Sequence, residues 1–209
     1  MKKALSILCM AGILLLLAGT ALGESLYVDN RETDKIYPER LNLRSEPSRS
    51  GGILGLYYTG TEVNVVSEDS DGYTKVDIGG VTGYMASEYL ITLDEAHERY
   101  GAESGFGDGR EAEIDLSGMW MSSVPLLPLT DPDSTALGAL STGDGVGLLG
   151  IVDDWAYVTA DVDGERKLGY VPLDTLTDVG GRKVLIVAGK KADSQTNLYD
   201  EPTTRAQPI

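Results

Sequence analysis

The chain has 209 residues, with 33 acidic and 17 basic side chains and a formal net charge of −16. A chain this negative repels phosphate backbones and anionic lipid headgroups, which argues against binding to nucleic acid or to a membrane surface. One histidine, His97, and one cysteine, Cys9, are too few for Cys/His catalysis, a histidine-rich metal site or a disulfide scaffold. We therefore expect no enzyme activity within this chain, no metal and no cofactor.

Residues 1–23 have the order of a secretory signal peptide. Lys2 and Lys3 precede an uncharged apolar stretch, which ends in small residues up to Gly23. An uncleaved membrane anchor is the alternative, because residues 4–23 are about long enough to span a bilayer. We expect cleavage of a helical signal peptide and a secreted protein. The mature chain then contains no cysteine, so its stability rests on packed β cores.

Short segments rich in valine, tyrosine and threonine follow over residues 24–91 and are separated by Gly, Asp and Pro turns. This pattern is typical of β-strands in a small barrel or sandwich. Alternation places Thr74, Val76 and Ile78 on one face of a strand, which we expect to be buried. Tyr73 then lies on the opposite face and points away from the core of its own domain.

Residues 92–118 are polar and acidic with dispersed glycines, which predicts a linker. Residues 93–100 have the composition of a short helix, although eight residues are marginal in isolation. His97 falls in this segment, and we expect it to be solvated and without a catalytic partner.

Residues 119–179 repeat the order of residues 24–91 at an offset of about eighty-five positions. By the same alternation, Ala156 and Val158 point into a second core, while Trp155 and Tyr157 point outward. The matched positions are Leu54-Gly55 with Leu137-Gly138, Gly60 with Gly143, Val63 and Val65 with Val146 and Leu148, Tyr73 with Trp155, and Gly83-Tyr84 with Gly169-Tyr170.

Residues 182–209 begin a third repeat, since Asn197 to Pro202 parallels Asn42 to Pro47. The later landmarks of the repeat do not follow, and about half a barrel cannot close its sheet. We therefore expect an incomplete third repeat and a truncated chain, beyond which an enzymatic domain could lie.

The first repeat carries motifs of a known family. Residues 41–47 read LNLRSEP, and DGYTKV at 71–76 and GYMASEYL at 83–90 follow in order. These motifs resemble the bacterial Src homology 3 (SH3) domain of secreted and cell-envelope proteins; the second repeat matches loosely and the third in part. The resemblance implies an all-β chain with two small SH3-like five-stranded barrels in tandem plus the truncated third copy. It also implies binding to cell-wall peptides or other envelope ligands.

Outward aromatic rings are the candidate ligand-binding residues, because a flat apolar ring with a polar tip suits a shallow peptide groove. Arg44 is a further candidate, since its guanidinium can pair with a peptide carboxylate. Two alternatives remain open: the rings pack between the repeats, and Arg44 forms an exposed ion pair with Glu46 or Glu88. The candidate rings are Tyr57, Tyr58, Tyr73, Tyr84, Trp155, Tyr157 and Tyr170.

The leading hypothesis is a secreted, non-enzymatic tandem module that binds a peptidoglycan peptide or an envelope protein. One alternative is the targeting region of a cell-wall hydrolase whose catalytic domain lies beyond residue 209. The other is a spacer or protein-interaction array, which predicts aromatic rings buried between the repeats.

Overall fold

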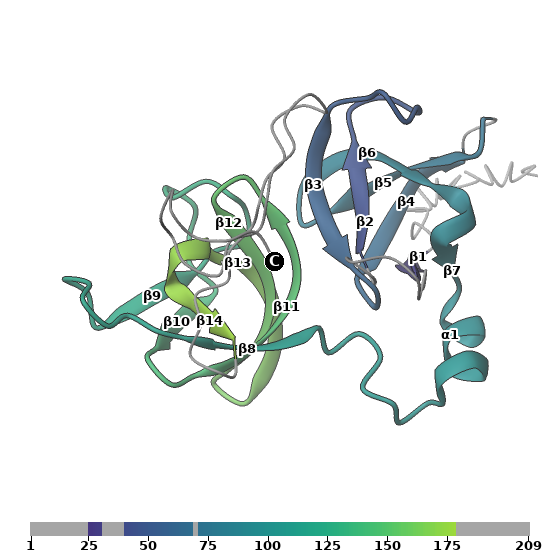
Figure 1. Cartoon of the computed structure of the whole chain (residues 1–209). Coiled ribbons are helices and arrows are strands. Elements are labelled where there is room, and N and C mark those ends of the chain that lie inside the picture. Colours follow the sequence, from purple (N-terminus) through teal and green to yellow (C-terminus); the bar gives the residue numbers. More distant parts are fainter. Residues whose placement is uncertain (1–24, 31–39, 69–70, 179–209) are drawn as a thin grey trace, which may run out of the picture.

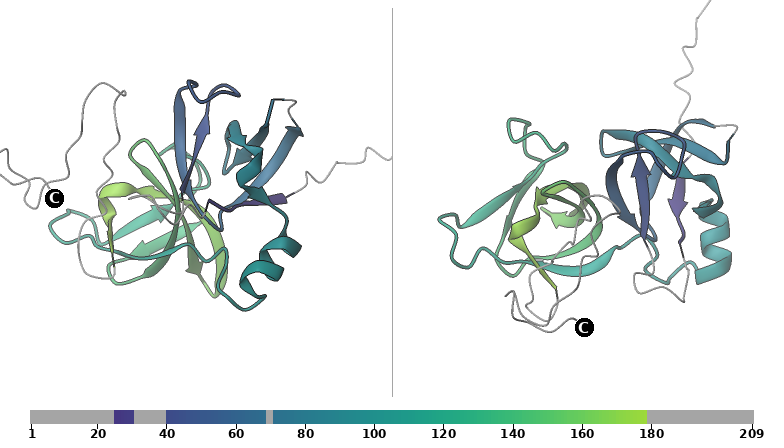
Figure 2. Two further views of the ribbon diagram at one scale, coloured as in Figure 1. Left: turned by 45° about the vertical axis from the view of Figure 1, so that its right-hand side comes forward. Right: turned by 45° about the horizontal axis from the view of Figure 1, so that its top comes forward.

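The computed structural model describes residues 25–30, 40–68 and 71–178, and it shows a chain built mainly of short antiparallel strands. The strands form two lobes that lie side by side in Figures 1 and 2. We call residues 25–100 lobe 1 and residues 110–178 lobe 2. The predicted signal peptide (1–23) and the incomplete repeat (182–209) lie outside the described residues. Within the described part, no helix has the length and apolar character needed to cross a bilayer.

Each lobe contains seven strands and one turn of 3-10 helix, with an α-helix added to lobe 1. Lobe 1 consists of β1 (Ser25–Val28), β2 (Arg40–Arg44), β3 (Ile53–Tyr58), β4 (Glu62–Glu68), β5 (Tyr73–Ile78), β6 (Val81–Ala86), η1 (Ser87–Tyr89), β7 (Leu90–Ile91) and α1 (Leu93–Tyr100). Lobe 2 consists of β8 (Arg110–Ile114), β9 (Ser123–Leu126), β10 (Gly138–Ser141), β11 (Gly145–Val152), β12 (Trp155–Val162), β13 (Glu165–Pro172), η2 (Leu173–Thr175) and β14 (Leu176–Asp178).

The strand pairing of lobe 2 repeats that of lobe 1. In lobe 1, β1 pairs with β4 and β7, β2 with β3 and β6, and β5 with β4 and β6. In lobe 2, β8 pairs with β11 and β14, β9 with β10, and β12 with β11 and β13. A single bridge from Leu127 to Tyr170 takes the place of the β2–β6 bridge from Arg44 to Tyr84. This order supports two SH3-like copies, an assignment that stays a prediction for lobe 2.

Each lobe has seven strands instead of the five expected for each barrel. The additional strands are the first and the last of each lobe, β1 and β7 in lobe 1 and β8 and β14 in lobe 2. The predicted inner face of β5 is confirmed, since Thr74, Val76 and Ile78 are buried. Both lobes also bend at a matched position. The register shifts between Val65 and Ser67 in β4 and between Leu148 and Gly150 in β11, and such a bulge increases local strand twist.

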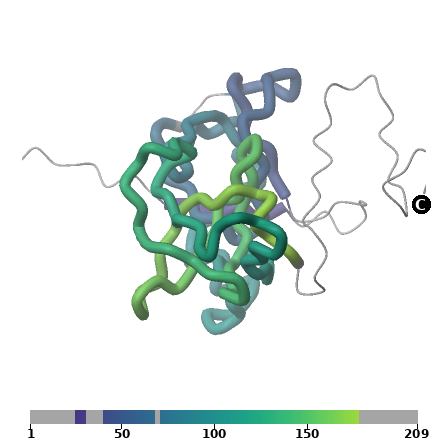
Figure 3. Tube along the Cα trace, turned by 90° about the vertical axis from the view of Figure 1, so that its left-hand side faces the viewer, coloured from purple at the N-terminus to yellow at the C-terminus, as the bar shows by residue number. Residues whose placement is uncertain are grey.

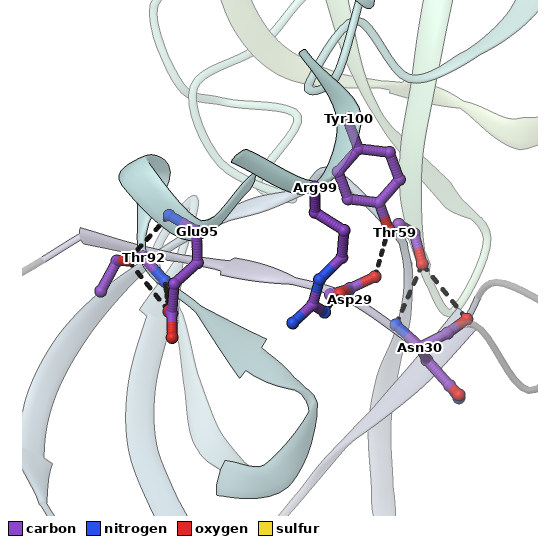
Figure 4. A network of polar contacts seen from close by, with 7 residues as sticks. All are labelled: Asp29, Asn30, Thr59, Thr92, Glu95, Arg99 and Tyr100. Atoms are coloured by element: carbon purple, nitrogen blue, oxygen red, sulfur yellow. Dashed lines mark hydrogen bonds and ion pairs between the residues drawn. The ribbon is translucent and has the colours of Figure 1, made fainter. Parts of the chain in front are cut away.

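The predicted helix at 93–100 is confirmed as α1, and His97 on it is exposed. Thr92 caps the helix in a reciprocal arrangement with Glu95 (Figure 4). The helix is fastened to lobe 1 because Arg99 and Tyr100 both contact the buried carboxylate of Asp29. The first part of the predicted linker therefore packs against β1.

The predicted linker, 92–118, extends too far along the chain. Its residues 110–114 form strand β8 of lobe 2. Only Ala112 and Ile114 of this strand are buried, and its other residues are charged and exposed. Ala112 and Ile114 alternate with Glu111 and Glu113, a period of two that could have indicated the strand, but the high charge of the segment favoured a linker.

The two lobes are joined by main-chain pairing as well as by packing. Strand β11 of lobe 2 pairs with β3 of lobe 1 through Gly150 with Tyr57 and Ile151 with Leu56. A buried hydrogen bond from the Thr61 hydroxyl to the carbonyl of Leu149 (2.7 Å) adds to this junction. In the view along the pair, lobe 2 lies in front of lobe 1 (Figure 3). The lobes therefore share one continuous sheet.

Four candidate rings lie at this junction, so the alternative in which the rings pack between the repeats holds for them. Tyr157, which alternation pointed away from its own core, is covered by lobe 1 instead of solvent. Tyr57 and Tyr170 are fully buried, and Tyr58 and Tyr157 are more than nine-tenths buried. Tyr157 packs edge-on against Tyr57 and lies beside Tyr170, with ring centres 6.3 and 4.9 Å away. Alternation placed Tyr157 on the side of β12 opposite Ala156 and Val158, and this is the side that lies at the junction. It did not show that the neighbouring lobe covers that side.

Candidate ligand-binding site

A cleft of about 770 Å³ opens on lobe 1 between β2, the loop after it, the start of β5 and η1. Three arginines line it, although the whole chain carries a charge of −16. We call this hollow the arginine cleft. Its lining includes two of the predicted site residues, Arg44 and Tyr73. The residues that matter for its chemistry are Asn30, Arg40, Arg44, Arg49, Asp71, Tyr73, Ala86 and Glu88.

Arg44 is held in place by the loop that follows β2. Its Nη1 donates to the carbonyl oxygen of Gly51 at 2.9 Å. The loop is itself closed by a hydrogen bond from the amide of Ser45 to the carbonyl of Gly52 (2.8 Å). Among the described residues, the expected alternative of an ion pair from Arg44 to Glu46 or Glu88 is not formed. The guanidinium is therefore positioned at the cleft without a carboxylate from the described part of the chain to neutralise it.

Tyr73 and Ala86 lie side by side on β5 and β6, where they form a cross-strand pair. Tyr73 is half-buried, so part of its ring remains accessible in the cleft. The methyl group of Ala86 leaves space beside the ring that a larger side chain would fill. This combination offers a flat apolar surface next to the arginines.

Asn30 lines the cleft, and its side-chain amide carries a buried acceptor. Its amide nitrogen Nδ2 donates to the carbonyl of Arg40 at 2.6 Å, and its main chain exchanges hydrogen bonds with the Thr59 hydroxyl (Figure 4). The side-chain oxygen Oδ1 is buried and has no hydrogen-bond partner. A buried acceptor without a partner carries a free-energy cost that a ligand N–H group can remove.

A family model for the bacterial SH3 domain matches residues 39–91, which contain most of the cleft. Residues 39–91 are a bacterial SH3 domain. The match confirms the resemblance carried by residues 41–47, 71–76 and 83–90. It also means that Arg44 and Tyr73 lie in the part of the chain whose family is shown.

The chain is also similar to a longer protein. It is 24% identical over 183 residues to "Putative N-acetylmuramoyl-L-alanine amidase YrvJ" of Bacillus subtilis (strain 168), a match that covers 79% of this chain. The chain spans about a third of that relative, 32% of its length.

Two solved structures, NlpC2 and NlpC1 from Trichomonas vaginalis, also resemble it, each with a TM-score of 0.32. Their sequence identities are 11% and 12%, and the matches cover 74% and 78% of this chain and 48% and 49% of theirs. This TM-score is below the level that indicates a shared fold.

The remaining candidate rings lie outside the arginine cleft of the SH3 domain. Tyr84 is half-buried on β6, with the Lys75 ammonium 5.9 Å from the centre of its ring. Trp155 is half-buried and packs against the apolar cluster shared by the two lobes. The structure therefore does not bring Tyr73 and Trp155 together on one aromatic face.

Lobe 2 has different residues at the positions that match the cleft of the SH3 domain. The bridges Arg44–Tyr84 and Leu127–Tyr170 set the correspondence of β2 with β9. Ser123, Pro125 and Leu127 then replace Arg40, Asn42 and Arg44. On the other wall, the pair Trp155–Pro172 replaces Tyr73–Ala86. The matched surface of lobe 2 therefore lacks the arginines and carries a proline where the SH3 domain has a methyl group.

The phenols at the junction have altered acidity because they are buried. Desolvation raises the pKa of Tyr157 to about 12, and the carboxylates of Glu62 and Asp77 act in the same direction. Burial also raises the pKa of Tyr57 and Tyr170. Over the described residues, no group of three or more His, Cys, Asp or Glu side chains could hold a metal ion.

Sequence reasoning missed Asn30, Arg40 and Arg49 as parts of the site. Arg40, Asn42 and Arg44 alternate along β2, so their shared face was a signal that the period of two could have supplied. Arg49 and Asn30 lie in loops and join the cleft only through the fold.

Proposed function

We propose that the SH3 domain attaches this protein to the cell wall by binding a wall peptide in the arginine cleft. The single observation that carries the proposal is a cleft with Arg44 and Tyr73 on its walls in a strongly acidic chain. A basic cleft with an aromatic wall suits an anionic peptide, because the guanidinium pairs with carboxylates and the ring covers the peptide's apolar parts.

The relative from Bacillus subtilis supports this proposal, because its name describes an enzyme that acts on cell-wall muramoyl peptides. A wall-binding role places the protein outside the cell, in agreement with the signal peptide expected at residues 1–23. The proposed role of this chain is binding without catalysis.

The proposed site differs from the aromatic face expected from the sequence. Lobe 2 supports lobe 1 through the junction at Tyr57, Tyr157 and Tyr170, and its matched surface lacks the arginines. We assign ligand binding to lobe 1 alone, and a structural role to the rings of the junction.

The test is co-sedimentation of the protein with purified cell walls. Tyr73→Ala is expected to weaken retention about tenfold, which corresponds to about 1.4 kcal/mol of binding free energy. Tyr84→Ala is the matched control, since Tyr84 is also a half-buried tyrosine of the same domain and lies outside the cleft. Unchanged retention of Tyr73→Ala, or an equal loss in both variants, would contradict the assignment of the cleft.

A second candidate function is the targeting region of a longer cell-wall hydrolase. It is favoured by the similarity to the amidase-named relative, of which this chain matches about a third. The sequence of the complete open reading frame tests it, because a hydrolase domain must appear beyond the matched region. A spacer role remains the third possibility, and it predicts that wild-type protein does not co-sediment with cell walls.

A further inference from the structure

The two walls of the arginine cleft carry opposite charges. Arg40 and Arg44 project from β2 and Arg49 from the loop after it. Asp71, in the turn before β5, and Glu88, in η1, line the cleft from the other elements. Among the described residues, neither Arg44 nor Arg49 forms an ion pair with a carboxylate. The cleft therefore has cationic groups to offer to a ligand anion on one wall.

The buried Oδ1 of Asn30 adds a second requirement on the ligand. This oxygen accepts no hydrogen bond in the protein, and it belongs to a residue that lines the same cleft. Its orientation is set because the other end of the amide, Nδ2, donates to the carbonyl of Arg40. A ligand that enters the cleft gains most if it carries an N–H donor near its anionic group.

We propose that the arginine cleft is selective for peptides with a free carboxylate beside an N–H donor, and that it discriminates against the corresponding carboxamides. This inference rests on the proposed function and specifies the ligand's chemistry. A carboxylate accepts two parallel N–H bonds from a guanidinium, whereas a neutral carboxamide has one acceptor oxygen and places its NH₂ group against the cation. The selectivity therefore follows from the arginines and not from the shape of the cleft.

The inference also sets the number of ligands per chain. Ser123, Pro125 and Leu127 at the matched positions of lobe 2 offer no cation and, at Pro125, no backbone donor. The two described lobes therefore bind one peptide between them, although the strand pairing is repeated.

The experiment is isothermal titration calorimetry of the full chain with three synthetic tetrapeptides of the muropeptide type. The first has free carboxylates, the second has all carboxylates converted to carboxamides, and the third has an ester in place of the amide next to the terminal carboxylate. We expect a stoichiometry of one for the first peptide, at least tenfold weaker binding of the second, and several-fold weaker binding of the third.

Variants of the cleft test which groups cause the selectivity. Arg49→Gln and Arg44→Lys are expected to reduce the ratio of acid to amide affinity, the second because lysine keeps the charge and loses the planar fork. Lys75→Gln is the control: it removes one positive charge from the same domain outside the cleft, and the ratio should stay unchanged.

Equal affinities for acid and amide peptides would overturn the inference and leave the proposed function intact if Tyr73→Ala still weakens retention on cell walls. No binding of the acid peptide would also overturn the inference, and wall co-sedimentation of the wild type then decides whether the proposed function survives. A stoichiometry of two would refute the assignment of the site to lobe 1 alone.

Discussion

Lobes 1 and 2 share a pairing order and a bulge at the same position, yet their matched surfaces have opposite character. Lobe 2 presents an apolar surface that packs on lobe 1, whereas the matched surface of lobe 1 is polar or exposed. The matched residues are Leu149 with Val66, Gly150 with Ser67, Tyr157 with Lys75, and Tyr170 with Tyr84.

The surface of lobe 1 that contacts lobe 2 also differs from the matched surface of lobe 2, but here lobe 1 has the larger apolar side chains. Strand β3 offers Leu56 and Tyr58 to lobe 2, whereas the matched strand β10 carries Ala139 and Ser141 at those positions. Within the described part of the chain, β10 pairs only with β9. The comparison teaches that the side chains, and not the shared strand order, decide which face packs and which face binds.

The largest expected effect separates the two matched tyrosines. Tyr170→Ala should lower the free energy of unfolding by about 3–5 kcal/mol, as for other large buried rings. The reason is that its ring is fully buried and its hydroxyl donates to the carbonyl of Ile78 at 3.1 Å. Tyr84→Ala should cost about 1 kcal/mol or less. Urea denaturation of both variants measures the difference. Equal losses of unfolding free energy would mean that burial at the junction does not stabilise the protein.

The two bulged residues form the next comparison. Leu149 is 2% exposed and lies in the apolar cluster shared by the lobes, whereas Val66 is 53% exposed. Leu149→Ala should therefore lower the free energy of unfolding by about 2–4 kcal/mol, and Val66→Ala should change it by less than about 0.5 kcal/mol. Thermal and urea unfolding check both values. A costly Val66→Ala would show that the bulge itself, and not its burial, supports the fold.

The smallest effect concerns alkaline pH. The folded state raises the pKa of Tyr157 to about 12, whereas an unfolded tyrosine titrates near 10. The folded protein thus keeps a proton that the unfolded chain releases. This contribution to stability is complete below about pH 10 and is lost as the pH rises through about 12. The free energy of unfolding should fall between pH 9 and pH 11. We expect this fall to be about 1 kcal/mol larger in the wild type than in Tyr157→Phe.

The matched control for this measurement is Tyr84→Phe on lobe 1. Like Tyr157→Phe, it removes one phenol hydroxyl, but from a half-buried tyrosine outside the junction. If the dependence flattens equally in both variants, the junction is not its source.

Local patterns predicted the elements with short-range causes. The inner face of β5, with Thr74, Val76 and Ile78, follows from a period of two. Helix α1 follows from its composition, and the SH3 motifs around Arg44 and Gly83 led to the family. Strand β8 was missed because its charge favoured a linker, although Ala112 and Ile114 alternate with two glutamates.

The candidate site was predicted in part. Arg44 and Tyr73 lie 29 positions apart in the chain, and both line the cleft. Tyr157 was assigned to solvent because alternation distinguishes the two sides of a strand without showing what covers each side. In β12, both sides are buried from Ala156 to Ala160.

By itself, the sequence determined the buried face of β5, helix α1 and the SH3 family of residues 39–91, because these depend on neighbours a few positions apart. Only the tertiary structure decided which aromatic rings are available to a ligand. Burial between lobes depends on contacts such as Tyr57 with Tyr157, a hundred positions apart, and no local pattern records such contacts. The orphan acceptor of Asn30 likewise exists only because folding places it at the arginine cleft.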